Sequence, residues 1–479
     1  MPRRTKIITT LGPATDQYEK MHALIEAGAN IIRINLSHGS YEEHRRRIEL
    51  AMRCAKELNK TIGVLLDLQG PKIRVARFEN PEGVQLNEGA TFFLDAACDK
   101  NAGNQTEVGL DYPELPQEVT AGDQLLLDDG RIVLSVVNVK GSRIECLVIN
   151  GGRLTNNKGL NRKGGGLSAP SLTEKDIKDI DFIATQPVDY VALSFPREAQ
   201  DIHYARKLLK EAGSTAQIVA KIERAEAIDN IDELIDASDA LMVARGDLGV
   251  EIGFAELPGV QKYIIHRARL RDKAVITATQ MMESMIHSPI PTRAEVSDAA
   301  NAILDGTDAV MLSAETATGD YPVKVVSVLN EICLAAERHR PLGVTSPEAH
   351  ETYERHDKAI AKAAMNIASH VSIKAIVALT ESGSTPLWMS RVRSGIPIYA
   401  LSRSAVTCKK VTLYRGVYPV EFDLTLYKIW EISRRALSLL VKQGILQEGD
   451  KVIVTKGDVL GVGGHTNALK ILTAQALED

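Results

Sequence analysis

Cysteine is scarce in this chain of 479 residues, and the cysteines that occur are far apart. They are Cys54, Cys98, Cys146, Cys333 and Cys408, an odd number without any Cys-x-x-Cys pair. Such spacing supports neither a disulfide framework nor a thiolate metal site. Isolated reduced thiols in a cytoplasmic protein are therefore expected.

Aromatic residues, net positive charge and long apolar runs are also missing. Aromatics make up 4% of the chain, too few for rows of base-stacking platforms. Lys and Arg number 57 against 62 Asp and Glu, so the formal charge is −5, which argues against a surface that grips nucleic acid. No run approaches the roughly 18 apolar residues of a membrane span, and the basic N-terminus lacks the apolar stretch of a signal peptide. We expect neither nucleic-acid nor membrane partners, while a local cationic site for a small anion stays open.

The first 70 residues alternate between strand and helix patterns. Strand, helix, strand, helix and strand are predicted over residues 6–11, 18–27, 30–37, 41–58 and 61–68. This βαβαβ order predicts a parallel sheet.

Short alternating strands and turns replace that pattern from about residue 69 to residue 167. Residues 124–139 form a predicted hairpin with Asp129-Gly130 at its turn, and helical periodicity is nearly absent. Four cations without an acid lie in 153–163, namely Arg153, Lys158, Arg162 and Lys163. These basic residues are equally consistent with two interpretations: a flexible hinge loop in contact with solvent, or the edge of a lid that lies near a bound anion.

Five more strands, each with a helix, follow residue 170, among them a helix predicted over 225–236 and a strand predicted over 240–246. They bring the parallel strands to eight. Eight βα units close a barrel whose site lies at the C-terminal strand ends. After a linker at 341–355 comes a smaller α/β layer with a mostly parallel sheet. We therefore predict an α/β fold: a (β/α)8 TIM barrel over 1–69 plus 170–341, an inserted all-β lid domain over 70–169, and a C-terminal α/β domain over 342–479.

Polar residues gather at the predicted C-terminal strand ends, where residues at i and i+2 share one face. They are Arg33, Asn35 and Ser37 on one strand, Asp67 on the next, then Lys221 with Glu223, Arg245 with Asp247, and Thr279. Polar ends on five strands are hard to explain by packing alone. The sequence therefore predicts an active site there.

These residue types can bind a divalent ion and an anion such as a phosphoryl group or an enolate. Glu223 and Asp247 are two hard carboxylates that can complete an octahedral Mg²⁺ site with substrate oxygens and water. Lys221 beside them can neutralise a transferring phosphoryl group or an enolate, and Arg33 offers a planar fork for phosphate. Asn35, Ser37 and Asp67 offer oxygens for a monovalent cation; an interior Arg33–Asp67 ion pair is the alternative. For His38, beside this cluster, a hydrogen-bonding role is favoured over a ligand role.

Six long segments in register resemble the pyruvate kinase family. They are RINLSHG (33–39), DLQGPKIR (67–74), AKIER (220–224), ARGDLG (244–249), TATQMMESM (277–285) and MLSAETATGDYP (311–322). The resemblance implies a β-domain that closes over the nucleotide, a C-terminal effector-binding domain, and glycolytic phosphoryl transfer from phosphoenolpyruvate to ADP, giving pyruvate and ATP.

The resemblance also implies roles for single residues. Lys221, Thr279 and Arg33 are expected to be catalytic, and Thr279 lies where the enolate is protonated. Arg33, Lys221, Gly246, Asp247 and Thr279 are expected to bind substrate, and Asn35, His38 and Arg74 the nucleotide. Glu223 and Asp247 are expected to hold Mg²⁺, for which Mn²⁺ can substitute; a second Mg²⁺ arrives with ADP. The monovalent-cation position consists of Asn35, Ser37, Asp67 and Leu68.

Two departures from the family pattern lead to further expectations. Lys72 stands where many members have a Glu associated with K⁺ dependence, so a fixed ammonium replaces the ion and K⁺ is expected to be dispensable. In the C-terminal domain, Thr380, Ser382, Gly383, Ser384 and Thr385 form a candidate phosphate nest, or a helix-capping loop. Glu381 stands where fructose-bisphosphate-activated members often have a basic residue. The expected effector is thus a sugar monophosphate or AMP.

Two other functions compete with this interpretation. One is a different Mg²⁺-enolate barrel enzyme, a lyase or aldolase, which does not need the lid. The other is a non-catalytic phosphometabolite sensor, which is expected to lose Lys221, Glu223 or Asp247. A cytoplasmic homotetramer is the family expectation.

Overall fold

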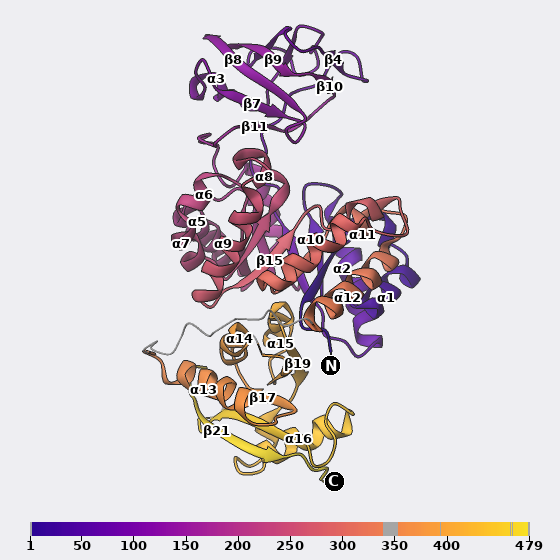
Figure 1. Ribbon diagram of the computed structural model, residues 1–479, viewed down its shortest axis with the longest axis vertical. Coiled ribbons are helices and arrows are strands. Elements are labelled where there is room, and N and C mark those ends of the chain that lie inside the picture. The colour runs from indigo at the N-terminus through magenta and orange to yellow at the C-terminus, as the bar shows by residue number, and fades with distance from the viewer. Residues whose placement is uncertain (1, 339–352, 393, 460, 462, 478–479) are drawn as a thin grey trace.

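Three bodies follow one another along the long axis of the molecule (Figure 1). The computed structural model describes residues 2–338, 353–392, 394–459, 461 and 463–477. A closed barrel lies in the middle, an all-β lid lies at one end and an α/β layer lies at the other (Figure 1). Most of the linker predicted at 341–355 lies outside the described residues.

The barrel contains the eight parallel strands that the sequence predicts, in the order β1-β16-β15-β14-β13-β12-β3-β2. Their core residues are apolar and buried, as expected where helices cover the outside and side chains fill the inside. The strands are β1 (Lys6–Thr10), β2 (Ile31–Asn35), β3 (Gly63–Asp67), β12 (Tyr190–Leu193), β13 (Gln217–Ile222), β14 (Ala240–Ala244), β15 (Ala274–Ala278) and β16 (Ala309–Leu312).

Local capping signals set where several barrel helices begin. Ser40, Thr173 and Thr292 each accept a hydrogen bond from the backbone three residues on, and an acidic side chain there bonds back. The barrel helices are α1 (Tyr18–Ala27), α2 (Tyr41–Glu57), α4 (Glu174–Ala184), α5 (Ala199–Glu211), α6 (Glu226–Asp229), α7 (Ile231–Ala237), α8 (Arg245–Ile252), α9 (Leu257–Leu270), α10 (Arg293–Asp305), α11 (Ala314–Ala317) and α12 (Pro322–Arg338), with 3-10 turns η1 (Pro13–Thr15) and η2 (Glu283–Ile286).

The lid is almost entirely β-structure. Its sheets have the orders β11-β7-β8-β9-β5-β6 and β10-β4, and β7 and β8 form the predicted hairpin. The basic residues of 153–163 contact lid partners: Arg153 pairs with Glu82, Lys158 with Asp128 and Arg162 with Asp123, while Lys163 bonds Gln124. The elements are β4 (Val84–Leu86), β5 (Thr91–Asp95), β6 (Glu107–Gly109), α3 (Leu115–Glu118), β7 (Gln124–Leu127), β8 (Ile132–Lys140), β9 (Arg143–Asn150), β10 (Gly152–Leu154) and β11 (Leu160–Arg162).

The C-terminal layer has a five-stranded sheet of order β19-β18-β17-β20-β21, in which only the β20–β21 pairing is antiparallel. The predicted mostly parallel sheet is therefore confirmed. Its elements are α13 (His356–His370), β17 (Ala375–Leu379), α14 (Ser384–Arg391), β18 (Ile398–Ser402), α15 (Ala405–Lys410), η3 (Val411–Leu413), β19 (Val417–Glu421), η4 (Leu424–Leu426), α16 (Ile432–Lys442), β20 (Lys451–Gly457) and β21 (Thr466–Thr473).

Two local predictions were wrong. The strand predicted over 240–246 ends at Ala244, and Arg245 begins helix α8. Arg245 and Asp247 therefore do not share a strand face. The single helix predicted over 225–236 is divided at Asn230 into α6 and α7.

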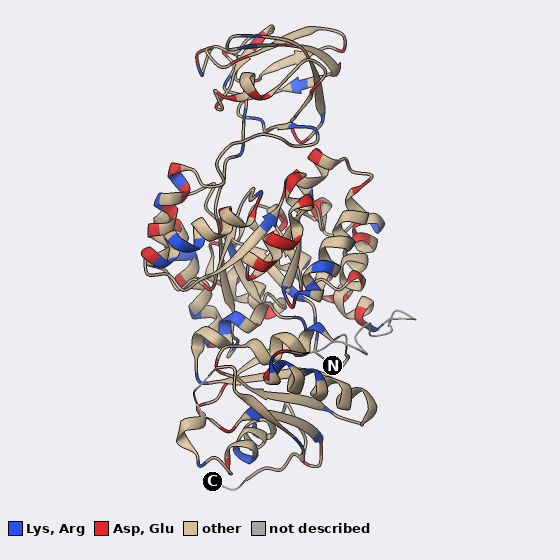
Figure 2. Cartoon of the chain, turned by 90° about the vertical axis from the view of Figure 1, so that its left-hand side faces the viewer, with Lys and Arg blue, Asp and Glu red and all other residues tan. Residues whose placement is uncertain are grey.

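The two ends of the barrel contact different bodies. At the N-terminal strand ends, Arg391 of α14 bonds the buried carboxylate of Asp308, and the Tyr190 hydroxyl donates to the Lys410 carbonyl. At the C-terminal ends, Lys72 of the lid junction reaches Asp247. The lid thus adjoins the strand ends that the sequence marks as the site. Charges of both signs are interspersed over the barrel helices on the face in Figure 2. No helix among the described residues is long and apolar enough to cross a bilayer.

Candidate active site

A buried charge network joins three barrel strands at the lid end. The Nε and an Nη of Arg33 lie 2.8 and 2.7 Å from Oδ2 of Asp67, and Nζ of Lys221 lies 3.3 Å from Oδ1. The Asp67 side chain is 1% exposed. Burial alone raises the pKa of Asp67, but the adjacent charges of Lys221 and Arg33 lower it. The interior Arg33–Asp67 ion pair, weighed as an alternative, is present.

The Nζ of Lys221, at the end of β13, is surrounded by oxygen acceptors. Besides Asp67, its Nζ lies 2.9 Å from Oε1 of Glu223 and donates to the Ser194 hydroxyl at 2.7 Å. The second Glu223 oxygen accepts the backbone N–H of Phe195 at 2.8 Å. Burial lowers the pKa of Lys221, but Asp67 and Glu223 raise it above its ordinary value. The ammonium form is therefore held in place.

Glu223 and Asp247 are two neighbouring carboxylates that could hold a divalent ion. Burial raises the pKa of Glu223 and Lys221 opposes this, while the negative charge of Asp247 raises the pKa further. An added cation relieves that repulsion, and hard carboxylates suit Mg²⁺, so the donor set fits the ion. No cluster of three or more His, Cys, Asp or Glu able to hold a metal is found in the described part of the chain. With two protein carboxylates, substrate oxygens and water would complete an octahedral Mg²⁺ site.

Lys72 forms an ion pair with Asp247, one of these two carboxylates. Its Nζ lies 2.9 Å from Oδ1 of Asp247, and the charges of Asp247 and Glu223 raise the pKa of Lys72 although burial lowers it. The structure thus places Lys72 on Asp247, while Asp67 is occupied by Arg33 and Lys221.

Thr279 meets the start of helix α8. Its hydroxyl accepts the Gly246 N–H at 2.8 Å and donates to the Ala278 carbonyl at 2.6 Å. Amide groups in the first turn of a helix favour an anion, so the turn at Gly246 and Asp247 suits a carboxylate.

The remaining predicted residues are less closely joined to this cluster. The Asn35 side-chain oxygen accepts the Ser37 N–H at 3.1 Å, and the Leu68 carbonyl accepts the Ser194 hydroxyl at 2.8 Å. His38 is exposed. Arg74 lies in the lid, where its guanidinium donates to the Asn157 carbonyl at 2.9 Å. The side-chain hydrogen bond of Arg74 therefore lies within the lid.

Sequence reasoning missed three residues that hold the cluster. They are Thr10, whose hydroxyl accepts from Arg33 at 2.9 Å, and Ser194 and Phe195, which bond Lys221 and Glu223. Ser194 follows strand β12 directly after the apolar run 190–193, so its position at a strand end was the available signal.

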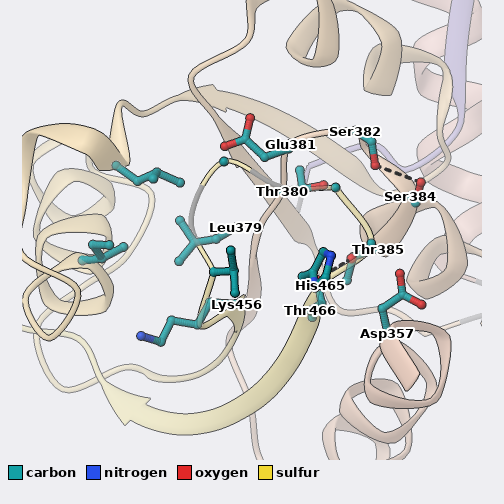
Figure 3. Close-up of a pocket in the computed structure, with 17 residues that line it drawn as sticks. Asp357, Leu379, Thr380, Glu381, Ser382, Ser384, Thr385, Lys456, His465 and Thr466 are labelled. Carbon is teal, nitrogen blue, oxygen red and sulfur yellow. Dashed lines mark hydrogen bonds between the residues drawn. The ribbon is translucent and has the colours of Figure 1, made fainter. Parts of the chain in front are cut away.

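A second candidate site is an open pocket of about 540 Å³ in the C-terminal layer (Figure 3). Four of the five predicted effector residues line it, namely Thr380, Ser382, Ser384 and Thr385. Lys456 of β20 and Thr466 of β21 also line it, and the Thr385 and Thr466 hydroxyls lie 2.9 Å apart (Figure 3).

Gly383 shapes the turn and is not among the lining residues. Its N–H donates to the Thr380 hydroxyl at 3.0 Å, its φ is +80°, and an added Cβ would meet Val411 at 2.9 Å. A glycine is therefore required there.

Comparisons with known proteins cover nearly the whole chain. A family model described as pyruvate kinase, barrel domain, matches residues 2–326, and one described as pyruvate kinase, alpha/beta domain, matches residues 358–472. Pyruvate kinase II of Salmonella typhimurium is 51% identical over 477 residues, which is 99% of both chains. The chain belongs to the pyruvate kinase family. A pyruvate kinase of Haemophilus influenzae is 50% identical over 99% of both chains.

A solved pyruvate kinase from Cryptosporidium parvum superposes with a TM-score of 0.93 at 32% identity, covering 99% of this chain and 96% of that one. Membership of the pyruvate kinase family gives the activity, transfer of a phosphoryl group from phosphoenolpyruvate to ADP. This activity excludes both alternative hypotheses, a lyase or aldolase and a non-catalytic sensor. Pyruvate kinases generally use Mg²⁺ and K⁺.

Proposed function

We propose that the cluster at the C-terminal strand ends carries this phosphoryl transfer. The observation that supports it is the position of Lys221, whose ammonium lies within 3.3 Å of both Asp67 and Glu223. Phosphoryl transfer depends mainly on positioning and charge neutralisation, and a rigidly held ammonium beside a metal position supplies both.

Each residue has a distinct part in the proposed reaction. Arg33, fixed by Asp67 and Thr10, grips the phosphoryl oxygens, and Lys221 neutralises charge on the transferring group and the developing enolate. Glu223 and Asp247 hold Mg²⁺, or Mn²⁺ in its place, which when bound neutralises phosphate and enolate oxygens. The α8 turn at Gly246 and Asp247 binds the carboxylate.

Thr279 is proposed to hand a proton to the enolate, directly or through water. Its hydroxyl already shares a hydrogen bond with the Gly246 N–H, so it adjoins the carboxylate position. A general acid must be within hydrogen-bond reach of the atom that it protonates.

The nucleotide is proposed to bind between barrel and lid. Asn35 and His38 face it from the barrel, and Arg74 brings a cation from the lid. The monovalent-cation position comprises Asn35, Ser37, Asp67 and Leu68. With Lys72 as a built-in cation beside the metal carboxylates, K⁺ is dispensable.

The open pocket of the C-terminal layer is proposed as the effector site. Thr380, Ser382, Gly383, Ser384 and Thr385 supply hydroxyl and amide donors at the start of α14, and Lys456 supplies one positive charge. Lys456 is the single lysine or arginine among the described residues that line the pocket, which suits one phosphate group. The effector is therefore a sugar monophosphate or AMP.

The organisation of the chain is proposed along the same lines. The domain boundaries are 1–69 plus 170–341 for the barrel, 70–169 for the lid and 342–479 for the effector domain. The protein works in the cytoplasm as a homotetramer.

A coupled assay tests the proposed site. We expect pyruvate from phosphoenolpyruvate and ADP only with Mg²⁺ or Mn²⁺ present. Glu223→Gln and Asp247→Asn should each raise the Mg²⁺ concentration for half-maximal rate at least ~10-fold. The variant Glu42→Gln, on the exposed face of α2, serves as the control. Unchanged Mg²⁺ dependence in both site variants would reject the assignment.

A further inference from the structure

Two consecutive residues after strand β15 have backbone conformations that ordinary side chains rarely adopt. Thr279 has φ of +65° and Gln280 has φ of +53°. For a β-branched residue such as Thr279 this left-handed conformation is an outlier, which costs on the order of 1–3 kcal/mol and persists only where surrounding contacts impose it. Some group must therefore hold this turn.

Arg245 is the group that contacts the turn. An Nη donates to the Thr279 carbonyl at 2.7 Å and to the Gln280 carbonyl at 3.2 Å, and Nε lies 3.3 Å from the carbonyls of Ala278 and Thr279. One guanidinium thus binds three successive carbonyls. Arg245 is 5% exposed, so these bonds are shielded from water.

Asp298 of helix α10 anchors this guanidinium. The other Nη of Arg245 lies 2.8 and 2.7 Å from the two Asp298 oxygens. The contacts therefore link the start of α8, the turn after β15 and the middle of α10.

We propose that Arg245, anchored by Asp298, is a positioning residue that imposes the left-handed turn and thereby aims the Thr279 hydroxyl at the substrate. This inference rests on the proposed role of Thr279. If the turn relaxed to negative φ, the Thr279 side chain would swing away from Gly246 and leave that amide without its acceptor.

The geometry requires arginine and not merely a positive charge. Three backbone carbonyls and one carboxylate surround the group in different directions. A guanidinium presents five donors in a rigid fork, whereas an ammonium presents three on a flexible stem. Arg245→Lys therefore keeps the positive charge but cannot contact all of these acceptors at once.

A double-mutant cycle on the full-length enzyme tests the proposal. We expect Arg245→Lys and Thr279→Ala each to lower kcat at least ~10-fold, with KM for ADP changed less than ~2-fold. If Arg245 acts through the Thr279 hydroxyl, the double variant should be within ~3-fold of Thr279→Ala. Arg267→Lys, at the peripheral ion pair with Asp232, is the matched control and should retain full rate.

A second readout follows the proton directly. Exchange of pyruvate methyl protons with deuterated solvent should fall in Arg245→Lys as it does in Thr279→Ala. Asp298→Asn leaves the guanidinium in place and should lower proton exchange and kcat by a smaller factor. If Arg245→Lys does not fold, Asp298→Asn takes its place in the double-mutant cycle. A merely structural role predicts a lower melting temperature with normal proton exchange.

The outcomes separate the two hypotheses. If Thr279→Ala keeps the wild-type rate, the proposed role of Thr279 is wrong. The contacts of Arg245 with the turn then cannot position a catalytic hydroxyl, and the positioning role falls with it. Suppose that Thr279→Ala loses activity, but that the fold-loss of kcat in the double variant equals the product of the two single fold-losses. The two residues then act independently, and only the positioning role of Arg245 is overturned.

Discussion

Lys72 and Asp247 form an ion pair that joins the lid junction to the barrel, with Nζ 2.9 Å from Oδ1. The two side chains are 26% and 21% exposed, so the pair is shielded from solvent on most sides. Lys72 places a fixed positive charge beside the carboxylates of Asp247 and Glu223. It also connects the entry to the lid with the proposed metal position.

Replacing this ammonium should create a requirement for a monovalent cation. In wild-type enzyme, exchanging tetramethylammonium for K⁺ should change kcat by less than ~2-fold. In Lys72→Glu, kcat in tetramethylammonium should fall at least ~10-fold and K⁺ should restore part of it, because a third carboxylate then lies beside Asp247 and Glu223. Lys158→Glu, at an ion pair within the lid, is the control. A many-fold response of wild type to K⁺ contradicts the account.

Glu251 makes the stability of the enzyme depend on pH. Burial raises its pKa from 4.5 to about 7, partly opposed by a hydrogen bond from the Ala225 N–H. Because the folded state then binds the proton more tightly than the unfolded chain, this residue lowers stability as pH rises from about 4.5 to 7.

The variant Glu251→Gln should remove that dependence. Its free energy of unfolding at pH 8 should exceed that of wild type by up to about 3 kcal/mol, and the difference should shrink towards pH 5. Urea denaturation at both pH values measures this. Asp232→Asn is a control of opposite sign, since hydrogen bonding from Arg267 lowers the pKa of Asp232. A gain that is the same at pH 5 and pH 8 counts against the explanation.

Asp308 and Arg391 form the buried joint between the barrel and the C-terminal layer. Their side chains are 1% and 3% exposed, and the carboxylate also accepts the Arg415 N–H at 3.0 Å. Arg391→Leu leaves a buried carboxylate without its counter-charge, so we expect a loss of about 3–5 kcal/mol in urea denaturation. Removing the exposed Arg153–Glu82 pair with Arg153→Ala should cost less than ~1 kcal/mol. Equal losses in the two variants are not expected on this account.

The effector pocket should prefer one phosphate. At sub-saturating phosphoenolpyruvate, a sugar monophosphate or AMP should raise the rate more than fructose bisphosphate does. Ser384→Asp places a carboxylate at the start of α14, where it repels phosphate, and should abolish activation while kcat at saturating substrate stays within ~2-fold. Stronger activation by the bisphosphate would refute the proposal.

Most of the architecture follows from local sequence patterns. The helix over 18–27 matches α1 residue for residue, and the eight barrel strands fall where apolar runs precede polar residues. The C-terminal strands β19 and β21 were not predicted. Tyr418, Pro419 and Lys470 interrupt their apolar patterns, and packing against neighbouring strands decides their conformation.

The site was predictable where residue type alone carries the chemistry, as for Lys221, Glu223 and Asp247. The partners of these residues were not, because they are chosen by geometry. Arg245 illustrates the difference: its spacing from Asp247 indicated a shared strand face, but the chain turns into α8 and directs its guanidinium to Asp298. Backbone donors such as the Phe195 N–H leave no signal in the side-chain sequence.

The most direct test of the account is the turnover of Lys221→Met compared with Lys221→Arg and wild type. Removing the ammonium held by Asp67 and Glu223 should lower kcat by ~10³-fold or more, whereas calorimetric binding of phosphoenolpyruvate with Mg²⁺ should change less than ~10-fold. Lys221→Arg should recover part of the rate. A Lys221→Met enzyme that turns over within ~10-fold of wild type would contradict the assignment of phosphoryl transfer to this cluster.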